Sequence, residues 1–190
     1  MIHKPSTVCY PLRIIKIGID KGPLSDIDTK LVRAASLTHR RTGLPIAAHS
    51  GDGTAALQAI ELLKEANVAP DAFIWVHTQA EKDKNLHLVA ARKGAWLEFD
   101  GIAPNSMEQH QDLISHMKSH KLLGRALISQ DAGWYNVGDV GGGTFRPYEF
   151  LLEQFVPYLR KAGFSSSEIR QLLVENPKHA LIPKVRKITQ

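Results

Sequence analysis

Four ionisable side chains in this sequence share the same kind of position, the end of a short apolar segment. The four residues are His49, His77, Asp100 and Asp131. Each segment is followed by polar or glycine-rich residues and then by a helical pattern. In a parallel α/β barrel the carboxyl ends of the strands form one face, and that face carries the chemistry. Imidazoles and carboxylates are common metal ligands, so their position predicts a metal site at this face.

Strand periodicity predicts which neighbours line the same wall as these residues. Side chains alternate between the two faces of a strand, so residues of the same parity share a face. If these faces point into a barrel, Lys16, His49 and His77 lie on adjacent walls at one end. The expected inner-facing apolar residues are Ile14, Ala47, Phe73, Trp75 and Trp96.

Lys16 is an unusual residue for the inner face of an apolar strand. A buried lysine is costly unless it is paired or functional, and burial disfavours its charged form. A neutral amine reacts with carbon dioxide to form a carbamate, which supplies two oxygens able to bridge two metal ions. The alternative is a lysine whose stem stays on the strand while its ammonium group reaches water at the rim.

Strands alternate with helices along the whole chain. Ser25 and Asp28 predict a capping box at the start of the first helix, and Asn176-Pro177 predicts a short terminal turn. Such alternation indicates parallel βαβ units with right-handed crossovers. A closed barrel of this class needs eight strands, so the sequence predicts either an open five-stranded sheet or part of a barrel. The expected strands are 12–18, a segment ending at 49, 72–76, 95–99 and 126–130, and the expected later helices include 147–162.

Composition limits the classes of protein to consider. The chain has 190 residues, 43% of them hydrophobic and 23% charged, with a net charge of +5. Basic residues are scattered among acidic ones, so we expect no nucleic-acid partner. The sequence has no apolar run of membrane-spanning length and no signal-peptide layout at its start, so we expect no membrane partner. The length suits one domain, which we expect to span residues 1–190. Because Cys9 is the single cysteine, we expect this domain to be cytoplasmic.

Two loops carry further signals. The segment Ser50-Gly-Asp-Gly-Thr-Ala-Ala follows a strand and opens a helix, as in a loose phosphate-binding turn. The match to a dinucleotide site is weak because the next strand does not end in the acid expected for a ribose. The loop 134–148 is rich in glycine and aromatic residues. Because functional loops are often long, we expect it to contact substrate, with Trp134 and Tyr135 as candidates.

Five motifs in this order resemble the phosphotriesterase family of the amidohydrolase superfamily. The resemblance runs from about residue 12 to residue 182 and includes the closing segment Val-Glu-Asn-Pro-Lys-His-Ala-Leu at 174–181. The motifs are Ile-Ile-Lys-Ile at 14–17, Gly-Leu-Pro-Ile-Ala-Ala-His-Ser at 43–50, Ile-Trp-Val-His at 74–77, Leu-Glu-Phe-Asp-Gly-Ile at 97–102 and Ile-Ser-Gln-Asp at 128–131.

The resemblance implies a binuclear zinc hydrolase on a TIM-barrel-like (β/α)8 fold, of which this chain would supply about five parallel βα units, strands four to eight. It also implies that Lys16 is carbamylated and bridges the metals, and that His49 and His77 bind one metal. Asp131 would bind the other metal and accept a proton from the bridging hydroxide. Asp100, with Trp134 and Tyr135, is expected to contact substrate. The family's first-strand His-x-His pair has no counterpart in these 190 residues.

Three functions follow as hypotheses. The first is a metal-dependent hydrolase acting on a small-molecule ester, lactone or phosphotriester. The second is a catalytically impaired metal-binding or interaction remnant of such an enzyme. The third is a nucleotide-binding open sheet with its ligand at the Gly51 loop. An incomplete barrel would leave apolar surface and strand edges uncovered, so we expect a second copy of the chain or an N-terminal segment to cover them.

Overall fold

The five expected strands form one parallel sheet in chain order. The structure is a computed structural model that describes residues 13–188, so Leu12, His3 and Cys9 lie outside the described residues. Every neighbouring pair of strands is parallel, which confirms the predicted topology. The strands are β1 (Ile15–Gly18), β2 (Ile46–His49), β3 (Phe73–Val76), β4 (Trp96–Phe99) and β5 (Ala126–Ile128).

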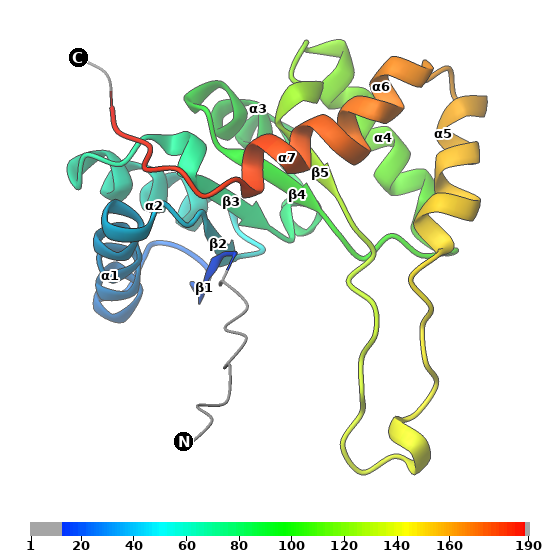
Figure 1. Cartoon of the computed structure of the whole chain (residues 1–190), viewed down its shortest axis with the longest axis horizontal. Coiled ribbons are helices and arrows are strands. Elements are labelled where there is room, and N and C mark those ends of the chain that lie inside the picture. The colour runs from blue at the N-terminus through cyan, green and yellow to red at the C-terminus, as the bar shows by residue number, and fades with distance from the viewer. Residues whose placement is uncertain (1–12, 189–190) are drawn as a thin grey trace, which may run out of the picture.

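All the main helices except the last pack against one side of this sheet, which we call the outer face, and the last helix lies across the other side (Figure 1). The main helices are α1 (Asp26–Thr42), α2 (Gly53–Glu65), α3 (Lys84–Lys93), α4 (Met107–Ser119), α5 (Val156–Lys161), α6 (Ser166–Arg170) and α7 (Asn176–Leu181). Wider π-type turns are Leu151–Phe155 and Gln171–Glu175, and short 3-10 turns are Pro70–Ala72, Thr78–Ala80, Leu123–Arg125 and Val140–Gly142. No described helix has both the length and the apolar character needed to cross a membrane.

The main core lies between the outer face and the helices. Alternate strand residues enter it, as the period of two requires. Phe73 and Trp75 are both fully buried there, so the expectation that they face inward was wrong. Both rings belong to the core that the helices cover, and the Trp75 ring packs against His87 of α3. The strand residues of this core are Ile46, Ala48, Phe73, Trp75, Leu97, Phe99 and Ala126.

The opposite side of the sheet, the inner face, carries a much smaller apolar cluster. Its strand residues are Ala47, Ile74, Trp96 and Leu127, and Ala180 of α7 packs against them. Ala47 and Trp96 therefore lie where the sequence predicted. Ile14 is 39% exposed and lines an open cavity of about 310 Å³ on this face. Among the described residues, α7 is the one helix that contributes to this cluster.

Local signals account for the helix boundaries that the sequence predicted. The Ser25 side chain accepts from the Asp28 amide, and Asp28 accepts from the Ser25 amide, which is the predicted capping box. Asn176 differs from expectation, because its backbone is helical and it continues the preceding turn into α7 instead of starting a separate one. Its side-chain amide explains this placement by donating to Leu123 and Ala126 carbonyls at 2.8 and 2.7 Å.

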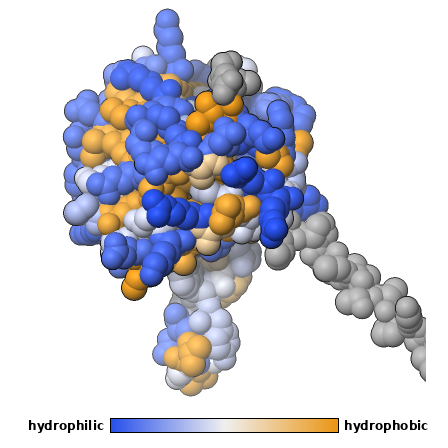
Figure 2. Space-filling model, turned by 90° about the vertical axis from the view of Figure 1, so that its left-hand side faces the viewer, coloured by the Kyte–Doolittle hydropathy of each residue, from blue (hydrophilic) through white to orange (hydrophobic). Residues whose placement is uncertain are grey.

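A long arm, residues 132–149, projects from the body between β5 and the turn that precedes α5 (Figure 1). The helix expected from residue 147 therefore begins later, because Pro147 belongs to the arm. Figure 2 shows the arm below the body, with hydrophobic side chains at its tip. Val137 and Val140 in this region are almost completely exposed, at 93% and 101% of their reference areas.

Candidate metal centre at the carboxyl ends of the strands

The expected site residues meet in one cavity of about 240 Å³. They come from all five strand ends, because parallel strands present their carboxyl ends to one edge of the sheet. Tyr135, by contrast, is outside this lining, and its ring packs against Gly142 within the arm. The lining residues are Lys16, His49, Val76, His77, Glu98, Asp100, Ser129, Asp131 and Trp134.

His77 reaches the cavity through an unusual backbone conformation. By strand parity it would share the outer face with Phe73 and Trp75. Its φ of 64° and ψ of 33° are left-handed, which ends the alternation directly after β3. Residues other than glycine adopt this conformation in only a few per cent of cases. The turn redirects the imidazole toward His49, so His77 lines the cavity although the argument from strand faces was wrong.

Two imidazole nitrogens converge in the cavity. Nε2 of His77 lies 2.8 Å from Nδ1 of His49, and the ring centroids are 4.2 Å apart. Two nitrogens bound to one tetrahedral zinc are separated by about 3.3 Å, given Zn–N bonds near 2.05 Å. Burial, followed by the nearby His77 and Lys16, lowers the pKa of His49. The 2.8 Å contact is a hydrogen bond, so one of the two nitrogens carries the shared hydrogen. Loss of that proton and a separation of about 3.3 Å would let both nitrogens bind one metal ion.

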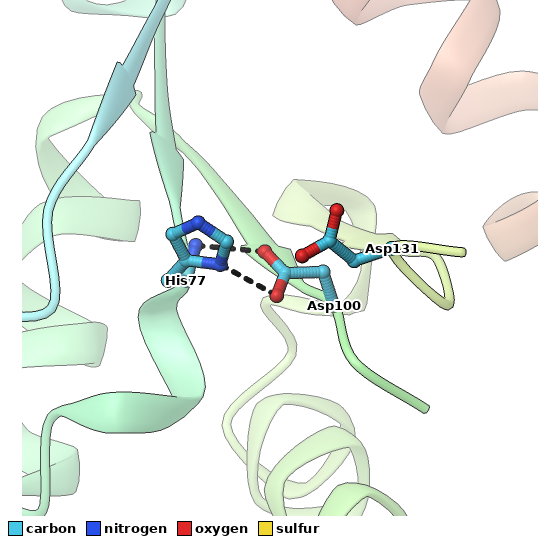
Figure 3. Close-up of side chains that lie close together, drawn as sticks. All are labelled: His77, Asp100 and Asp131. Carbon is cyan, nitrogen blue, oxygen red and sulfur yellow. Dashed lines mark hydrogen bonds and ion pairs between the residues drawn. The ribbon is translucent and has the colours of Figure 1, made fainter. Parts of the chain in front are cut away.

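Asp100 holds His77 from behind. Its Oδ1 accepts from His77 Nδ1 at 2.6 Å, and its Oδ2 accepts from the His77 amide at 2.9 Å (Figure 3). Gln79 Nε2 donates to the same Oδ1 at 2.7 Å. Asp100 is only 3% exposed. A carboxylate that accepts a hydrogen bond from Nδ1–H keeps the proton on Nδ1 and leaves Nε2 free of hydrogen, which is the tautomer a metal ligand requires.

Asp131 faces the same point from the end of β5. Ligand atoms of His77, Asp100 and Asp131 all lie within 4.8 Å of one another, close enough to hold one ion (Figure 3). Asp131 is exposed, and its φ of 42° places it in the left-handed region. Both His77 and Asp131 therefore depend on positive φ at a strand end. Such conformations persist where the surrounding structure holds them, and they cluster at functional sites.

Lys16 lines the cavity but is exposed, contrary to the expectation of burial. It pairs with Ala47 in the sheet register, and its Nζ donates to the adjacent Ile17 carbonyl at 3.3 Å. The physical reason is its place on β1, an edge strand of the described sheet, where no other described strand covers the inner side. Lys16 therefore follows the alternative given for it above: its stem lies along the strand and its ammonium group reaches water at the rim.

Glu98 is a member of the site that the sequence reasoning missed. It lies on the inner face between Trp96 and Asp100, and Ser129 Oγ donates to its Oε1 at 2.6 Å. Burial raises the pKa of Glu98 to about 8, the charge on Asp100 adds to the rise, and the Ser129 hydrogen bond opposes it. The neutral form removes one negative charge from beside Asp131. The parity of the segment Trp-Leu-Glu-Phe-Asp was the signal that would have found it.

The Gly51 loop does not provide a free phosphate site. Asp52 caps α2 by accepting from the Ala55 amide, and Glu81 Oε2 accepts from the Gly53 amide at 2.9 Å. Two carboxylates therefore occupy the helix N-terminus where a phosphate would bind. A side chain at Gly53 would also collide with Leu86 at 2.6 Å. The glycine is explained by close packing against α3, which argues against the nucleotide hypothesis.

The fold and the cavity together describe a parallel α/β protein with histidines and acids at its strand ends. The model of the phosphotriesterase family matches residues 11–181. The chain belongs to this family, as the order of the motifs indicated.

Two relatives and one solved structure define the extent of the match. The phosphotriesterase homology protein of Escherichia coli (strain K12) is 30% identical over 167 residues, which cover 86% of this chain and 56% of the relative. A phospho-furanose lactonase of Mycoplasmopsis synoviae (strain 53) is 30% identical over 178 residues, covering 88% and 50%. The crystal structure of an amidohydrolase from Mycoplasma synoviae superposes with a TM-score of 0.79 at 27% identity, covering 93% and 52%.

The chain thus spans about half the length of the relatives it matches. Its five βα units correspond to part of a TIM-barrel-like (β/α)8 fold, which confirms the predicted fold class.

Proposed function

We propose that this chain carries the metal-binding strand ends of a metal-dependent hydrolase that acts on a small-molecule ester, lactone or phosphotriester. The observation that carries the proposal is the convergence of His49 Nδ1 and His77 Nε2, 2.8 Å apart, with Asp131 at the same cavity. Membership of the phosphotriesterase family supports the reaction class. A relative named as a phospho-furanose lactonase makes lactones the first substrates to test.

Each residue has a proposed role that follows from its geometry. His49 and His77 would hold a zinc or similar divalent ion through neutral ring nitrogens. A bound ion of this kind lowers the pKa of water toward neutrality and polarises the substrate oxygen. Asp131 would also contact the ion and would accept the proton from the attacking water. Asp100 keeps the proton of His77 on Nδ1, so we propose a positioning role for it in place of the substrate contact expected from sequence.

Lys16 is the proposed link to a second metal. Its exposed ammonium group lies at the cavity rim, where carbon dioxide has access. After the ammonium group loses a proton, the neutral amine would react with carbon dioxide and release a second proton, and the resulting carbamate would add two oxygens to the site. Trp134 lines the cavity and remains a candidate for substrate contact, while Tyr135 would act through the conformation of the arm. A cytoplasmic location remains part of the proposal, because a single cysteine suits a reducing compartment.

The second candidate function is a metal-binding or interaction protein without catalysis. The open inner face favours it, because Lys16 and Ile14 remain exposed where further barrel strands would pack. A second copy or an N-terminal segment is the proposed cover for this face. The two candidates share the histidine pair and differ in turnover.

Hydrolysis of a panel of lactones, carboxylic esters and aryl phosphotriesters tests the first candidate. The zinc-loaded chain is expected to turn over at least one substrate, and Asp131→Asn is expected to lower kcat by about 100-fold or more, since general acid–base groups contribute 10²–10⁴. Asp112→Asn is the matched control, because Asp112 is exposed, pairs with Lys84 and does not line the cavity. Zinc binding without turnover of any substrate would support the second candidate, and unchanged kcat in Asp131→Asn would contradict the role of Asp131.

A further inference from the structure

The base of the arm is tied directly to the backbone of Asp131. The arm has an outgoing limb, which leaves β5, and a returning limb, which leads back to the body. The Asp131 carbonyl accepts from Nε1 of Trp134, on the outgoing limb, at 2.6 Å. It also accepts a hydrogen bond from Arg146 Nη2 on the returning limb. One carbonyl oxygen therefore receives a donor from each side of the arm.

Gln130 forms a second tie one residue earlier. Its carbonyl accepts from the same Arg146 Nη2 atom. Its side-chain Nε2 donates to the Pro147 carbonyl at 2.8 Å, and its Oε1 accepts from the Leu151 amide at 2.8 Å. Gln130 is 7% exposed, so these bonds are largely shielded from water. The two limbs are thus joined at their base by Arg146 and Gln130.

These ties act on a residue whose backbone conformation needs support. A φ of 42° at Asp131 is uncommon for a residue other than glycine, and such a conformation persists only where the surrounding structure holds it. Because the backbone sets the direction of the Cα–Cβ bond, holding the Asp131 carbonyl also restricts the positions that its carboxylate can reach. A guanidinium group suits this task, because it offers several donors in a rigid plane.

The position of the Arg146 side chain is energetically unfavourable for one of its nitrogen atoms. Its Nε atom is buried and has no hydrogen-bond partner among the described residues. Leaving a buried donor unsatisfied is unfavourable. The same position of the guanidinium group directs Nη2 to the carbonyls of Gln130 and Asp131, which follow β5.

We propose that Arg146 is a positioning residue that holds Asp131 in its left-handed conformation and so couples the arm to the metal centre. This inference rests on the proposed function, because the effect on turnover requires Asp131 to act there. Trp134 supports Asp131 from the other limb with a single donor. Movement of the returning limb would therefore release Asp131 and weaken both metal binding and proton transfer.

Three variants separate this role from a general effect on folding. Arg146→Ala removes the donor to both carbonyls, and Arg146→Lys keeps the charge but loses the planar guanidinium. Arg160→Ala is the matched control, because Arg160 lies in α5 and donates to Ser166, away from the arm.

The first measurement uses metal-free protein and is independent of activity. The ¹⁵N relaxation order parameter of the Asp131 amide is expected near 0.85 in the wild type and in Arg160→Ala, and below about 0.6 in Arg146→Ala. An unchanged order parameter in Arg146→Ala would overturn the inference, whatever the hydrolysis assays show. This readout therefore separates failure of the inference from failure of the proposed function.

The second measurement uses the zinc-loaded protein and the substrate found in the panel. Arg146→Ala is expected to lower kcat by about 10–100-fold, the range typical of residues that support a metal site, while KM changes less than about threefold. Guanidinium ion at millimolar concentration is expected to restore part of the kcat of Arg146→Ala, and Arg146→Lys is expected to fall between wild type and Arg146→Ala. Equal kcat in wild type and Arg146→Ala would overturn the coupling.

Discussion

The outer and inner faces of the five-stranded sheet differ in how the described chain covers them. The outer face contributes seven strand residues to a core closed by helices, whereas the inner face contributes four to a small cluster beside α7. The same alternating strands therefore serve two purposes. One set of side chains stabilises the layers, and the other set leads to the cavity at the strand ends. The period of two therefore separates the core residues from most of the cavity residues, and His77 is the exception because its positive φ ends the alternation.

Ile46→Ala and Ile74→Ala compare the two faces with the same substitution. Ile46 lies on β2 and faces the outer core at 0% exposure, and Ile74 lies on β3 and faces inward at 3%. Ile46→Ala is expected to lower the free energy of unfolding by about 3–5 kcal/mol, because dense surroundings cannot collapse around the lost atoms. Ile74→Ala is expected to cost about 2 kcal/mol, the lower end of the same range.

Urea unfolding followed by circular dichroism measures both values. An equal loss of unfolding free energy in the two variants would contradict the difference between the faces. It would mean that the inner cluster is as completely covered in solution as the outer core.

The pH dependence of stability tests how completely the outer core buries His87. It is 1% exposed in α3, between the rings of Trp75 and Phe99. Burial lowers the pKa of His87 to about 4. Because the folded pKa lies below the ordinary value of 6.5, the unfolded chain binds the proton more readily between these values. Stability is therefore complete above pH 6.5 and falls as the pH drops toward 4, by about 3 kcal/mol in total.

His87→Gln is expected to remove most of this pH dependence, as measured by urea unfolding at pH values from 4 to 7. His120→Gln is the control, because His120 is exposed at the end of α4. A wild-type slope that survives in His87→Gln would show that another group causes the acid sensitivity.

Sequence reasoning predicted the strand order and named most residues that line the cavity at the strand ends, because both depend on period and position. It assigned the wrong face to Phe73 and Trp75 because it assumed that His77 continued the strand. Parity fails at a residue with positive φ, and that conformation is imposed by contacts such as the two hydrogen bonds from His77 to Asp100.

The exposure of Lys16 and the ties of Arg146 depend on segments far away in the sequence. Lys16 is exposed because of which strands flank β1, and Arg146 meets Asp131 across 15 positions of chain. Short-range patterns contain neither fact. Glu98 is different, because its parity with Asp100 was visible in the sequence and only its burial was not.

Zinc stoichiometry tests the central claim, that the strand ends form a metal centre, more directly than any assay of turnover. After equilibration with zinc and removal of the excess, the metal in wild type, His77→Ala and His120→Ala is measured by plasma mass spectrometry. We expect at least one zinc per wild-type chain, the same content in His120→Ala, and loss of the ion in His77→Ala, because the remaining ligands would hold zinc poorly. Equal zinc content in wild type and His77→Ala would contradict a metal centre that includes His77.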